Sequence, residues 1–323
     1  MSGRVLTAYA PDGVPEVAAG DDLAALLVTA LGEEWTLADG DVVCVTSKVV
    51  SKAEGRVLPG DRDDALPGET VRVVARRGRT TIVRNRLGLT MAAAGIDASN
   101  VAPGHVVVLP VDPDESARRL RRELAARTGV DVAVVVTDTS GRAWRQGQTD
   151  IAIGAAGLVV LDDHRGRVDA HGHELVVTAP AVADEAAGAA ELVQAKLGAR
   201  PFAVLRGLAD HVLPPGEDGP GAAALVRAEA GDLFGYGARE AVVRALAGDT
   251  DAAGFGAAAS PDELVGLLRE VLGADAPIEL RADTVVVRAE DPRVPTLAHA
   301  CGWTVTSPAA SSAVDQVLRP VVP

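Results

Sequence analysis

The stretch DVAVVVTDTSGRAWRQGQTDIAIG, residues 131–154, predicts the class of fold. Its opening, DVAVVV, is apolar on both faces of the expected strand, which is typical of a central strand that helices cover on two sides. A run of polar residues follows, and a new apolar stretch begins at Ile151. Ligands of open α/β sheets lie beyond the carboxyl ends of such strands. The stretch therefore indicates an α/β fold with a ligand site at the end of this strand.

Strands and helices are expected to alternate along much of the chain. Short β-branched runs indicate strands at 41–46, 71–75, 80–84, 105–110, 157–161 and 200–206. Helices are expected over 21–32 and about 180–197, each closed by a glycine. Another helix begins after Asp112, with Pro113 in its first turn and Glu115 completing a capping box. This alternation predicts a mixed α/β (α+β) domain.

Two segments rich in Gly, Pro and Asp divide the chain. Residues 213–222 indicate a surface loop and residues 248–261 a linker. We therefore expect a first domain over 1–247, followed by the linker and a small C-terminal α/β extension over 248–323. In the extension, a helix is expected over 260–273, strands near 277–282 and 283–289, and helices near 294–301 and 308–318.

The composition argues against several classes of function. The chain has 323 residues, 48% of them hydrophobic, and a formal net charge of −14. This charge disfavours a nucleic-acid or anionic-membrane partner, although local arginine clusters still allow small anionic ligands. The two cysteines, Cys44 and Cys301, provide neither a disulfide framework nor a zinc site. No apolar run reaches about 18 residues and the N-terminus lacks a signal-peptide core, so a soluble, cytoplasmic protein is expected.

The polar run after the strand at 131–138 is the first candidate site. Asp138 and Thr139 offer a carboxylate and a hydroxyl to a hard cation such as Mg²⁺. Arg142 and Arg145 could clamp carboxylates or phosphates, and Trp144 offers a flat face to a ring system. The alternative interpretation is an Asp/Ser turn with solvated arginines. Spacing alone does not decide between the two.

A second candidate is VTSKVVSKAEGR, residues 45–56. Ser47, Lys48, Ser51 and Lys52 follow an expected strand and carry donors suited to phosphate oxygens. No GxxxxGK[ST] pattern occurs, so this segment is not a P-loop. Taken alone, these residues favour the alternative, an exposed amphipathic segment with solvated lysines.

A third candidate is RNRLGLTMAAAGIDASN, residues 84–100, where Asp97 and Asn100 lie in a polar segment that by default indicates a turn. Asp97 would complete a divalent-cation site only if the fold brought it beside Asp138. His164, His171 and His173 lie in a stretch typical of a polar hairpin. A metal site there is the less favoured interpretation.

Several long motifs occur in an order that resembles a known family. TSKVVSKAEGR, RNRLGLTMAAAGIDASNV, LPVDPDESARRLR, VVTDTSGRAWRQGQTDIAIGAAGL and HELVVTAPAVADEAA resemble the coenzyme F420-0:L-glutamate ligase family, as does the early GVPEV followed by GDDL. The resemblance covers roughly residues 5–247. It implies the distinctive mixed α/β fold of that family and an intertwined homodimer with the site near the subunit interface.

The resemblance also implies roles for the matching residues. The residues that would contact GTP are Val14, Pro15, Glu16, Val17, Ser47, Lys52 and Asn100. Asp97 and Asp138 would hold one divalent cation, and Thr139 would belong to a second. The implied cofactors are GTP and Mn²⁺ or Mg²⁺, two per site, with K⁺ as a further candidate. Glu185 and Glu191 remain open as ligands of the second cation. Lys52, Arg142 and Arg145 are our candidates for catalytic residues, the two arginines as holders of anionic substrate groups.

The implied reaction joins L-glutamate to F420-0 and then adds successive γ-linked glutamates. A carboxylate is a poor acyl donor, so the precursor would first take a phosphoryl group from GTP, and glutamate would attack the acyl phosphate. Only residues 249–323 follow the ligase region, too few for the flavin-binding domain of the mycobacterial fusion form, so ligase activity without reductase activity is expected. The alternatives are a related amide ligase acting on another acidic acceptor and a non-catalytic nucleotide-binding subunit.

Overall fold

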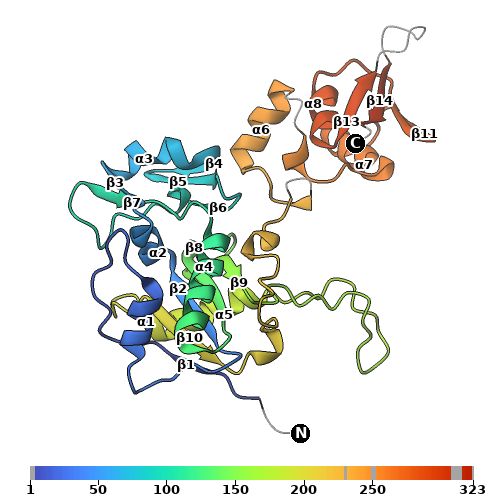
Figure 1. Cartoon of the computed structure of the whole chain (residues 1–323). Coiled ribbons are helices and arrows are strands. Elements are labelled where there is room, and N and C mark those ends of the chain that lie inside the picture. Colours follow the sequence, from blue (N-terminus) through green and yellow to red (C-terminus); the bar gives the residue numbers. More distant parts are fainter. Residues whose placement is uncertain (1–3, 229–230, 249–251, 307–314, 322–323) are drawn as a thin grey trace. The chain divides into compact units, whose positions relative to one another are not determined.

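Residues 4–228, 231–248, 252–306 and 315–321 are described by the computed structural model of the chain (Figure 1). They form two compact units. Unit 1 spans Met1–Arg72 and Gly78–Val226, and unit 2 spans Val73–Arg77 and Arg227–Pro323. Each unit buries hydrophobic residues in a core of its own.

A five-stranded sheet forms the centre of unit 1. In spatial order its strands are β1 (Thr7–Tyr9), β10 (Phe202–Arg206), β2 (Val42–Thr46), β8 (Ala133–Gly141) and β9 (Gln148–Ala156). Strands β2 and β8 run parallel, and the other neighbouring pairs run antiparallel. Parallel neighbours end at the same edge of a sheet, so the residues that follow β2 and those at the end of β8 lie close together.

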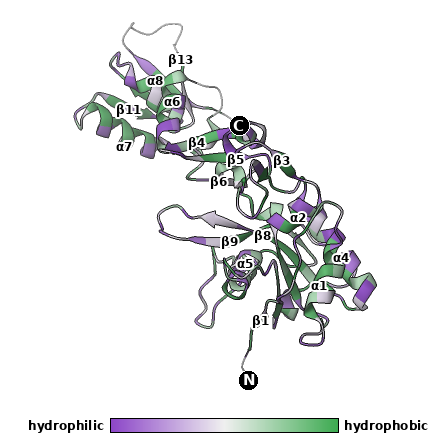
Figure 2. Ribbon diagram, turned by 90° about the vertical axis from the view of Figure 1, so that its left-hand side faces the viewer, coloured by the Kyte–Doolittle hydropathy of each residue, from purple (hydrophilic) through white to green (hydrophobic). Residues whose placement is uncertain are grey.

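Helices cover both faces of this sheet. The helices of unit 1 are α1 (Leu23–Leu31), α2 (Ser47–Ala53), α3 (Arg62–Glu69), α4 (Pro113–Thr128) and α5 (Val182–Gln194). Val43 and Val134 pack with α1 and α4 on one face, whereas Val42 and Val135 pack with α5 on the other. Figure 2 shows the strands at the centre of unit 1 in the colours of hydrophobic residues. The prediction of a central strand, apolar on both sides because both sides are covered, is confirmed.

Local signals set the ends of several helices. The side chain of Asp112 accepts a hydrogen bond from the Glu115 amide, Pro113 lies at the first helical position, and α4 ends at Gly129 with φ of 74°. The Glu115 carboxylate itself accepts hydrogen bonds from Arg118 and Arg122. Helix α4 therefore begins where Asp112 and Pro113 predict, but the Glu115 side chain pairs with these arginines and does not complete the predicted capping box.

Two expectations about unit 1 were wrong. The helix expected to reach 197 ends at Gln194, because Ala195 takes a positive φ of 52° that interrupts the helix before the glycine. Residues 157–161 form no strand and make a single bridge, from Leu158 to Val212. Gly157 turns the chain there with φ of 72°.

Smaller elements complete unit 1. Strand β3 (Val57–Pro59) pairs with β7 (His105–Val107), and β5 (Thr80–Asn85) pairs with β6 (Thr90–Ala92). Short 3₁₀ turns occur at Ala93–Gly95, Ala209–His211 and Ala222–Leu225. Strand β4 (Thr70–Arg77) contains the residues that pass into unit 2. Within the described ranges, no helix is both long and apolar enough to cross a membrane.

Unit 2 packs helices against a four-stranded antiparallel sheet. The strands in spatial order are β11 (Ile278–Arg281), β12 (Thr284–Val287), β14 (Gln316–Pro320) and β13 (Trp303–Thr306). The helices are α6 (Ala238–Ala247), α7 (Pro261–Leu272) and α8 (Arg293–Ala300), with a 3₁₀ turn at Ala253–Phe255. Leu264, Val285, Trp303 and Leu318 lie in its core. The helix predicted over 260–273 and the two strands that follow it are confirmed.

The prediction of a helix near 308–318 is wrong for the part of this range that the structure describes. Residues 316–320 form β14, which pairs with both β12 and β13. This pairing buries Leu318 completely between two strands, a tertiary gain that overrides the local helical pattern. Residues 307–314, the first part of the expected helix, lie outside the described residues.

Candidate functional site

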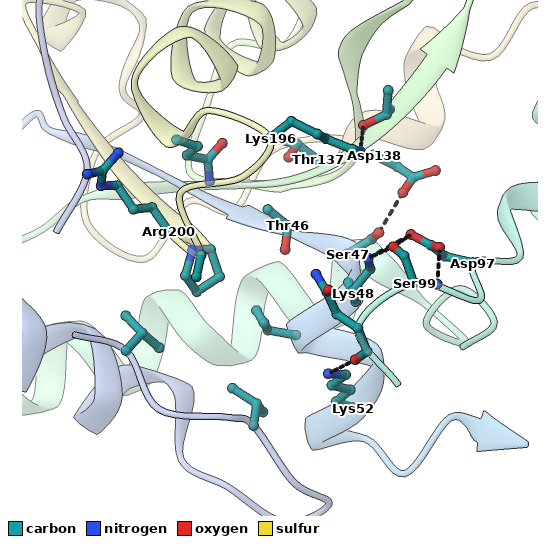
Figure 3. A pocket seen from close by; sticks show the side chains of 18 of the residues that line it. Thr46, Ser47, Lys48, Lys52, Asp97, Ser99, Thr137, Asp138, Lys196 and Arg200 are labelled. Carbon is teal, nitrogen blue, oxygen red and sulfur yellow. Dashed lines mark hydrogen bonds and ion pairs between the residues drawn. The ribbon is translucent and has the colours of Figure 1, made fainter. Parts of the chain in front are cut away.

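A cavity of about 890 Å³ lies at the carboxyl ends of β2 and β8. In the parallel register Thr46 lies opposite Thr137, so the start of α2 faces the end of β8 (Figure 3). The cavity volume is near the upper end of the range for small-molecule sites. The ligand site predicted at the end of the strand 131–138 therefore coincides with a real cavity.

Four parts of unit 1 line the cavity: the loop before α1, the start of α2, the segment before β7, and the region joining β8, β9 and the end of α5. The residues that the resemblance assigned to GTP or metal all lie on its wall: Val14, Pro15, Glu16, Val17, Ser47, Lys52, Asp97, Asn100, Asp138 and Thr139. The fold thus brings together side chains that are far apart in the sequence.

Asp138 lines the cavity, and its carboxylate has one hydrogen-bond donor in the part of the chain that the structure describes. Ser47 Oγ donates to Asp138 Oδ1 over 2.7 Å. Burial raises the pKa of Asp138 to about 7, and the nearby charges of Asp150 and Asp97 act in the same direction. A carboxylate that is enclosed and close to two others is electrostatically suited to a cation.

The carboxylate of Asp97 has more partners than that of Asp138. Its carboxylate accepts hydrogen bonds from the Ser99 amide at 2.7 Å and the Ser99 hydroxyl at 3.1 Å, and Lys48 Nζ lies 2.7 Å from Oδ2. Burial works to raise the pKa of Asp97, but the hydrogen bonds from Lys48 and Ser99 hold it below the usual value. The Asp97 amide and carbonyl both bond to Val107, which fixes the backbone of this segment.

Lys52 connects three segments of the wall. The residue is only 6% exposed, and its ammonium forms an ion pair with Glu16 and donates to the carbonyl of Asn100 over 2.6 Å. A buried lysine with these partners is not the solvated lysine of an exposed amphipathic helix. Of the four candidates on α2, Ser47, Lys48 and Lys52 line the cavity, as the phosphate-binding interpretation requires, and the buried Ser51 does not.

Asp150 is a wall residue that the sequence analysis missed. Its carboxylate is buried and accepts hydrogen bonds from Thr137 Oγ1 at 3.0 Å and Thr139 Oγ1 at 2.8 Å, while its amide donates to Glu191 Oε2. In the antiparallel pair β8–β9, Asp150 lies opposite Thr139. An acidic residue at the start of the apolar run DIAIG was the available signal.

The segment after α5 contributes further residues that the sequence analysis passed over. Gln194 is 5% exposed, and neither polar atom of its side chain has a hydrogen-bond partner among the described residues. Ala195 and Ala199 both take a φ of 52°, a conformation that is costly for residues with a Cβ. Lys196 Nζ lies 3.5 Å from Thr139 Oγ1. This strained segment places an unpaired amide and an ammonium beside the acidic wall.

The structure does not bring Arg142, Trp144 and Arg145 to the cavity. They lie in the turn between β8 and β9, where Trp144 is 88% exposed and Arg142 Nη2 donates to the carbonyl of Gln146. Neither arginine is among the cavity-lining residues of this chain. The geometry of unit 1 alone therefore gives these side chains no role in the cavity.

The donors around Asp97 and Asp138 fit a hard cation. They are carboxylate and hydroxyl oxygens, which Mg²⁺ and Mn²⁺ prefer, and Mg²⁺ is commonly held by one or two carboxylates together with water and substrate phosphates. In the part of the chain that is described, no three His, Cys, Asp or Glu residues gather as a complete metal site. Two of the loop histidines contact local carboxylates instead: the half-buried His164 contacts Asp162, and the exposed His173 contacts Asp169.

Comparisons with known proteins match the part of the chain that carries the cavity. Residues 13–207 match the family described as F420-0:gamma-glutamyl ligase. A coenzyme F420:L-glutamate ligase of Methanopyrus kandleri is 42% identical over 241 residues, which cover 68% of this chain and 93% of the relative. Proteins of the same name from Halobacterium salinarum and Methanothermobacter thermautotrophicus are 44% and 40% identical, over 58% and 61% of this chain and 80% and 86% of their own lengths.

Proposed function

We infer that this chain, which belongs to the F420-0:gamma-glutamyl ligase family, is a coenzyme F420:L-glutamate ligase. The reaction joins the amino group of L-glutamate to a carboxylate of F420-0 in an amide bond. The observation that carries this inference is the extent of the family match, because residues 13–207 include every residue that lines the cavity. We assign the activity to a domain of residues 1–247, with 248–323 as an extension.

We propose that GTP drives the reaction through an acyl phosphate. The terminal carboxylate of F420-0 takes the γ-phosphoryl group, which leaves GDP and an activated acyl group. The amino group of glutamate then attacks the acyl carbon, loses a proton, forms the amide and expels phosphate. A cavity lined by both ammonium groups and carboxylates supports this order, because the first step brings two anions together.

We propose that Asp97 and Asp138 would hold one divalent cation, Mn²⁺ or Mg²⁺, and that Thr139 would belong to the site of a second. A bound cation would neutralise charge on the phosphates and align the transferred group. The support is the chemistry of the donors, all of them oxygens, and the position of Asp138 close to the negative charges of Asp97 and Asp150.

The chain's own residues would then position the reactants. Ser47 holds the Asp138 carboxylate in one orientation, and Asp150 orients the Thr139 hydroxyl. Lys52, tied to Glu16 and the Asn100 carbonyl, would present a fixed positive charge to the nucleotide phosphates. Val14, Pro15 and Val17 would form the apolar part of the nucleotide wall.

We propose a homodimer. The support is the resemblance to the family, and in unit 1 the strongly exposed Val177 and Leu197 are apolar side chains that a partner chain could cover. Light scattering coupled to gel filtration should give twice the chain mass. A monomer at the concentrations used for activity would contradict the proposal.

We also propose that Arg142 and Arg145 hold anionic groups of the substrates. Their position in an exposed turn leaves their guanidinium groups accessible, which supports this role. Replacing both with glutamine should raise the Michaelis constant for F420-0 or glutamate. Unchanged Michaelis constants would contradict the assignment.

The decisive experiment is mass spectrometry of products formed from F420-0, L-glutamate, GTP and Mn²⁺ by the purified chain. A ladder of products, each heavier by one glutamyl unit, is expected and would show successive addition. A single added unit would support the ligase but contradict successive addition. No product, with GTP intact, would contradict the proposed function, and a repeat with other acidic acceptors would then test the related amide ligase. Reactions without GTP, and with the Asp138→Asn variant, serve as controls.

A further inference from the structure

Lys48 lies directly against Asp97, one of the two carboxylates assigned to the proposed metal site. The residue lies in the first turn of α2, and its Nζ is 2.7 Å from Asp97 Oδ2 and 2.8 Å from Ser99 Oγ. Its side chain is largely enclosed, so this ammonium is held by its neighbours and is not a solvated surface charge. Figure 3 shows Lys48, Ser99 and Asp97 as one connected group at the cavity wall.

The contacts of Asp97 leave little room for another ligand. Oδ1 accepts from the Ser99 amide, and Oδ2 accepts from the Ser99 hydroxyl while facing the Lys48 ammonium. A carboxylate has about four lone-pair positions, and three of those on Asp97 are engaged. A cation bound to the carboxylate of Asp97 would lie close to the Lys48 ammonium and would repel it.

Asp138, the other carboxylate assigned to the metal site, has different contacts. Asp138 accepts a hydrogen bond from Ser47, and among the described residues no lysine or arginine nitrogen forms an ion pair with it. The other lysines on the wall are engaged elsewhere: Lys52 pairs with Glu16, and Lys196 faces the Thr139 hydroxyl. The positive charge that neutralises one carboxylate of the proposed metal site is therefore that of Lys48.

We propose that Lys48 is a built-in competitor for the divalent cation at Asp97. Its ammonium neutralises the carboxylate while no metal is bound, and metal binding displaces it into the cavity. This inference rests on the proposed function, which assigns Asp97 to the metal. It adds that metal affinity is held down by the chain itself, because each metal ion must first break the ion pair between Lys48 and Asp97.

Equilibrium binding of Mn²⁺ alone to the full chain tests this, with free Mn²⁺ measured by electron paramagnetic resonance. Lys48→Met should bind Mn²⁺ roughly tenfold more tightly than the wild-type chain, the size expected for losing one half-buried, charge-assisted hydrogen bond as competitor. Lys48→Gln should act in the same direction and serves if the methionine variant does not fold. Lys48→Arg keeps the positive charge and should bind no more tightly than wild type.

Arg200→Met is the matched control. It removes one positive charge from the same cavity wall, but from an arginine that pairs with Asp12, which is not one of the residues proposed to hold metal. General electrostatics predicts a modest increase in Mn²⁺ affinity for any such variant, about threefold at most. If Arg200→Met tightened binding as much as Lys48→Met, or if Lys48→Met left the affinity unchanged, the competitor role would be overturned.

The Asp97→Asn variant tests the proposed metal site independently of the role of Lys48. The variant should weaken Mn²⁺ binding if Asp97 is a ligand, and Lys48→Met should then have little further effect in the double variant. If Asp97→Asn bound Mn²⁺ as tightly as the wild-type chain, the proposed metal site itself would be wrong. If Asp97→Asn weakened binding while Lys48→Met did not tighten it, the inference about Lys48 alone would fail.

Discussion

Ser47 Oγ lies 2.7 Å from Asp138 Oδ1, and this hydrogen bond joins the residue after β2 to the last part of β8. The two residues are 91 positions apart in the chain, and the parallel pairing of the two strands brings them together. Because this hydroxyl is the one hydrogen-bond donor to the Asp138 carboxylate within the described ranges, it determines how the carboxylate faces the cavity. A metal site at Asp138 would depend on it.

Replacing Ser47 with alanine should therefore lower kcat/KM about 10- to 100-fold, as is typical when a group that orients a metal ligand is lost. Ser51→Ala is the matched control, since Ser51 lies one turn later on α2 and its buried hydroxyl has no hydrogen-bond partner among the residues that the structure describes. Steady-state kinetics at saturating Mn²⁺ would compare the two. Equal activity of Ser47→Ala and wild type would show that this hydrogen bond does not matter to the reaction.

The unpaired amide of Gln194 should cost stability in the absence of a ligand. A buried polar group without a partner typically costs about 1–3 kcal/mol, so Gln194→Met should raise the melting temperature of the ligand-free chain by several degrees. The same variant should be stabilised less by GTP if the amide contacts the nucleotide. Gln146→Met, at an exposed position, should change neither quantity. A lower melting temperature for Gln194→Met would mean that the amide has a partner in solution.

The cysteines should be unreactive in the folded protein. Burial raises the pKa of Cys44 to about 12 and that of Cys301 to about 11, so almost no thiolate forms at pH 8. A chromogenic disulfide reagent should label neither thiol in the native state and both in denaturant. Cys44 is completely buried and Cys301 slightly exposed, so Cys301 should react first as denaturant is added. Rapid native labelling of Cys44 would contradict its placement in the central strand β2.

Arg121 should be the charged residue on which the packing of unit 1 depends most. It is 3% exposed, and its guanidinium donates to Asp131, to Asp218 and to the carbonyls of Val132 and Glu217. Replacing it with methionine would leave these acceptors without a partner and should destabilise the unit by about 3–5 kcal/mol. Arg122→Met, on the exposed side of α4, should change stability by less than about 0.5 kcal/mol. Thermal unfolding monitored by circular dichroism would compare the stabilities of the two variants with that of the wild-type chain.

The sequence predicted the elements whose signals are local. The apolar run at 132–136 indicated a central strand because both faces lacked polar residues, and Asp112 with Pro113 indicated the start of α4. The same local rules failed at 316–320, where pairing with two strands overrides the helical pattern. They also placed the end of α5 too late, because a positive φ at an alanine is not signalled by its neighbours.

For the candidate site, too, some features followed from the sequence and others only from the tertiary structure. The sequence by itself determined the family and the residue types available for chemistry, since the motifs containing Ser47, Asp97 and Asp138 are long and occur in a fixed order. Only the tertiary structure decided that Lys48 forms an ion pair with Asp97 and that Asp150 orients Thr139. The physical reason is range. Capping and hydrophobic periodicity act over a few residues, whereas a site built at the ends of parallel strands depends on contacts that are set only when the sheet assembles.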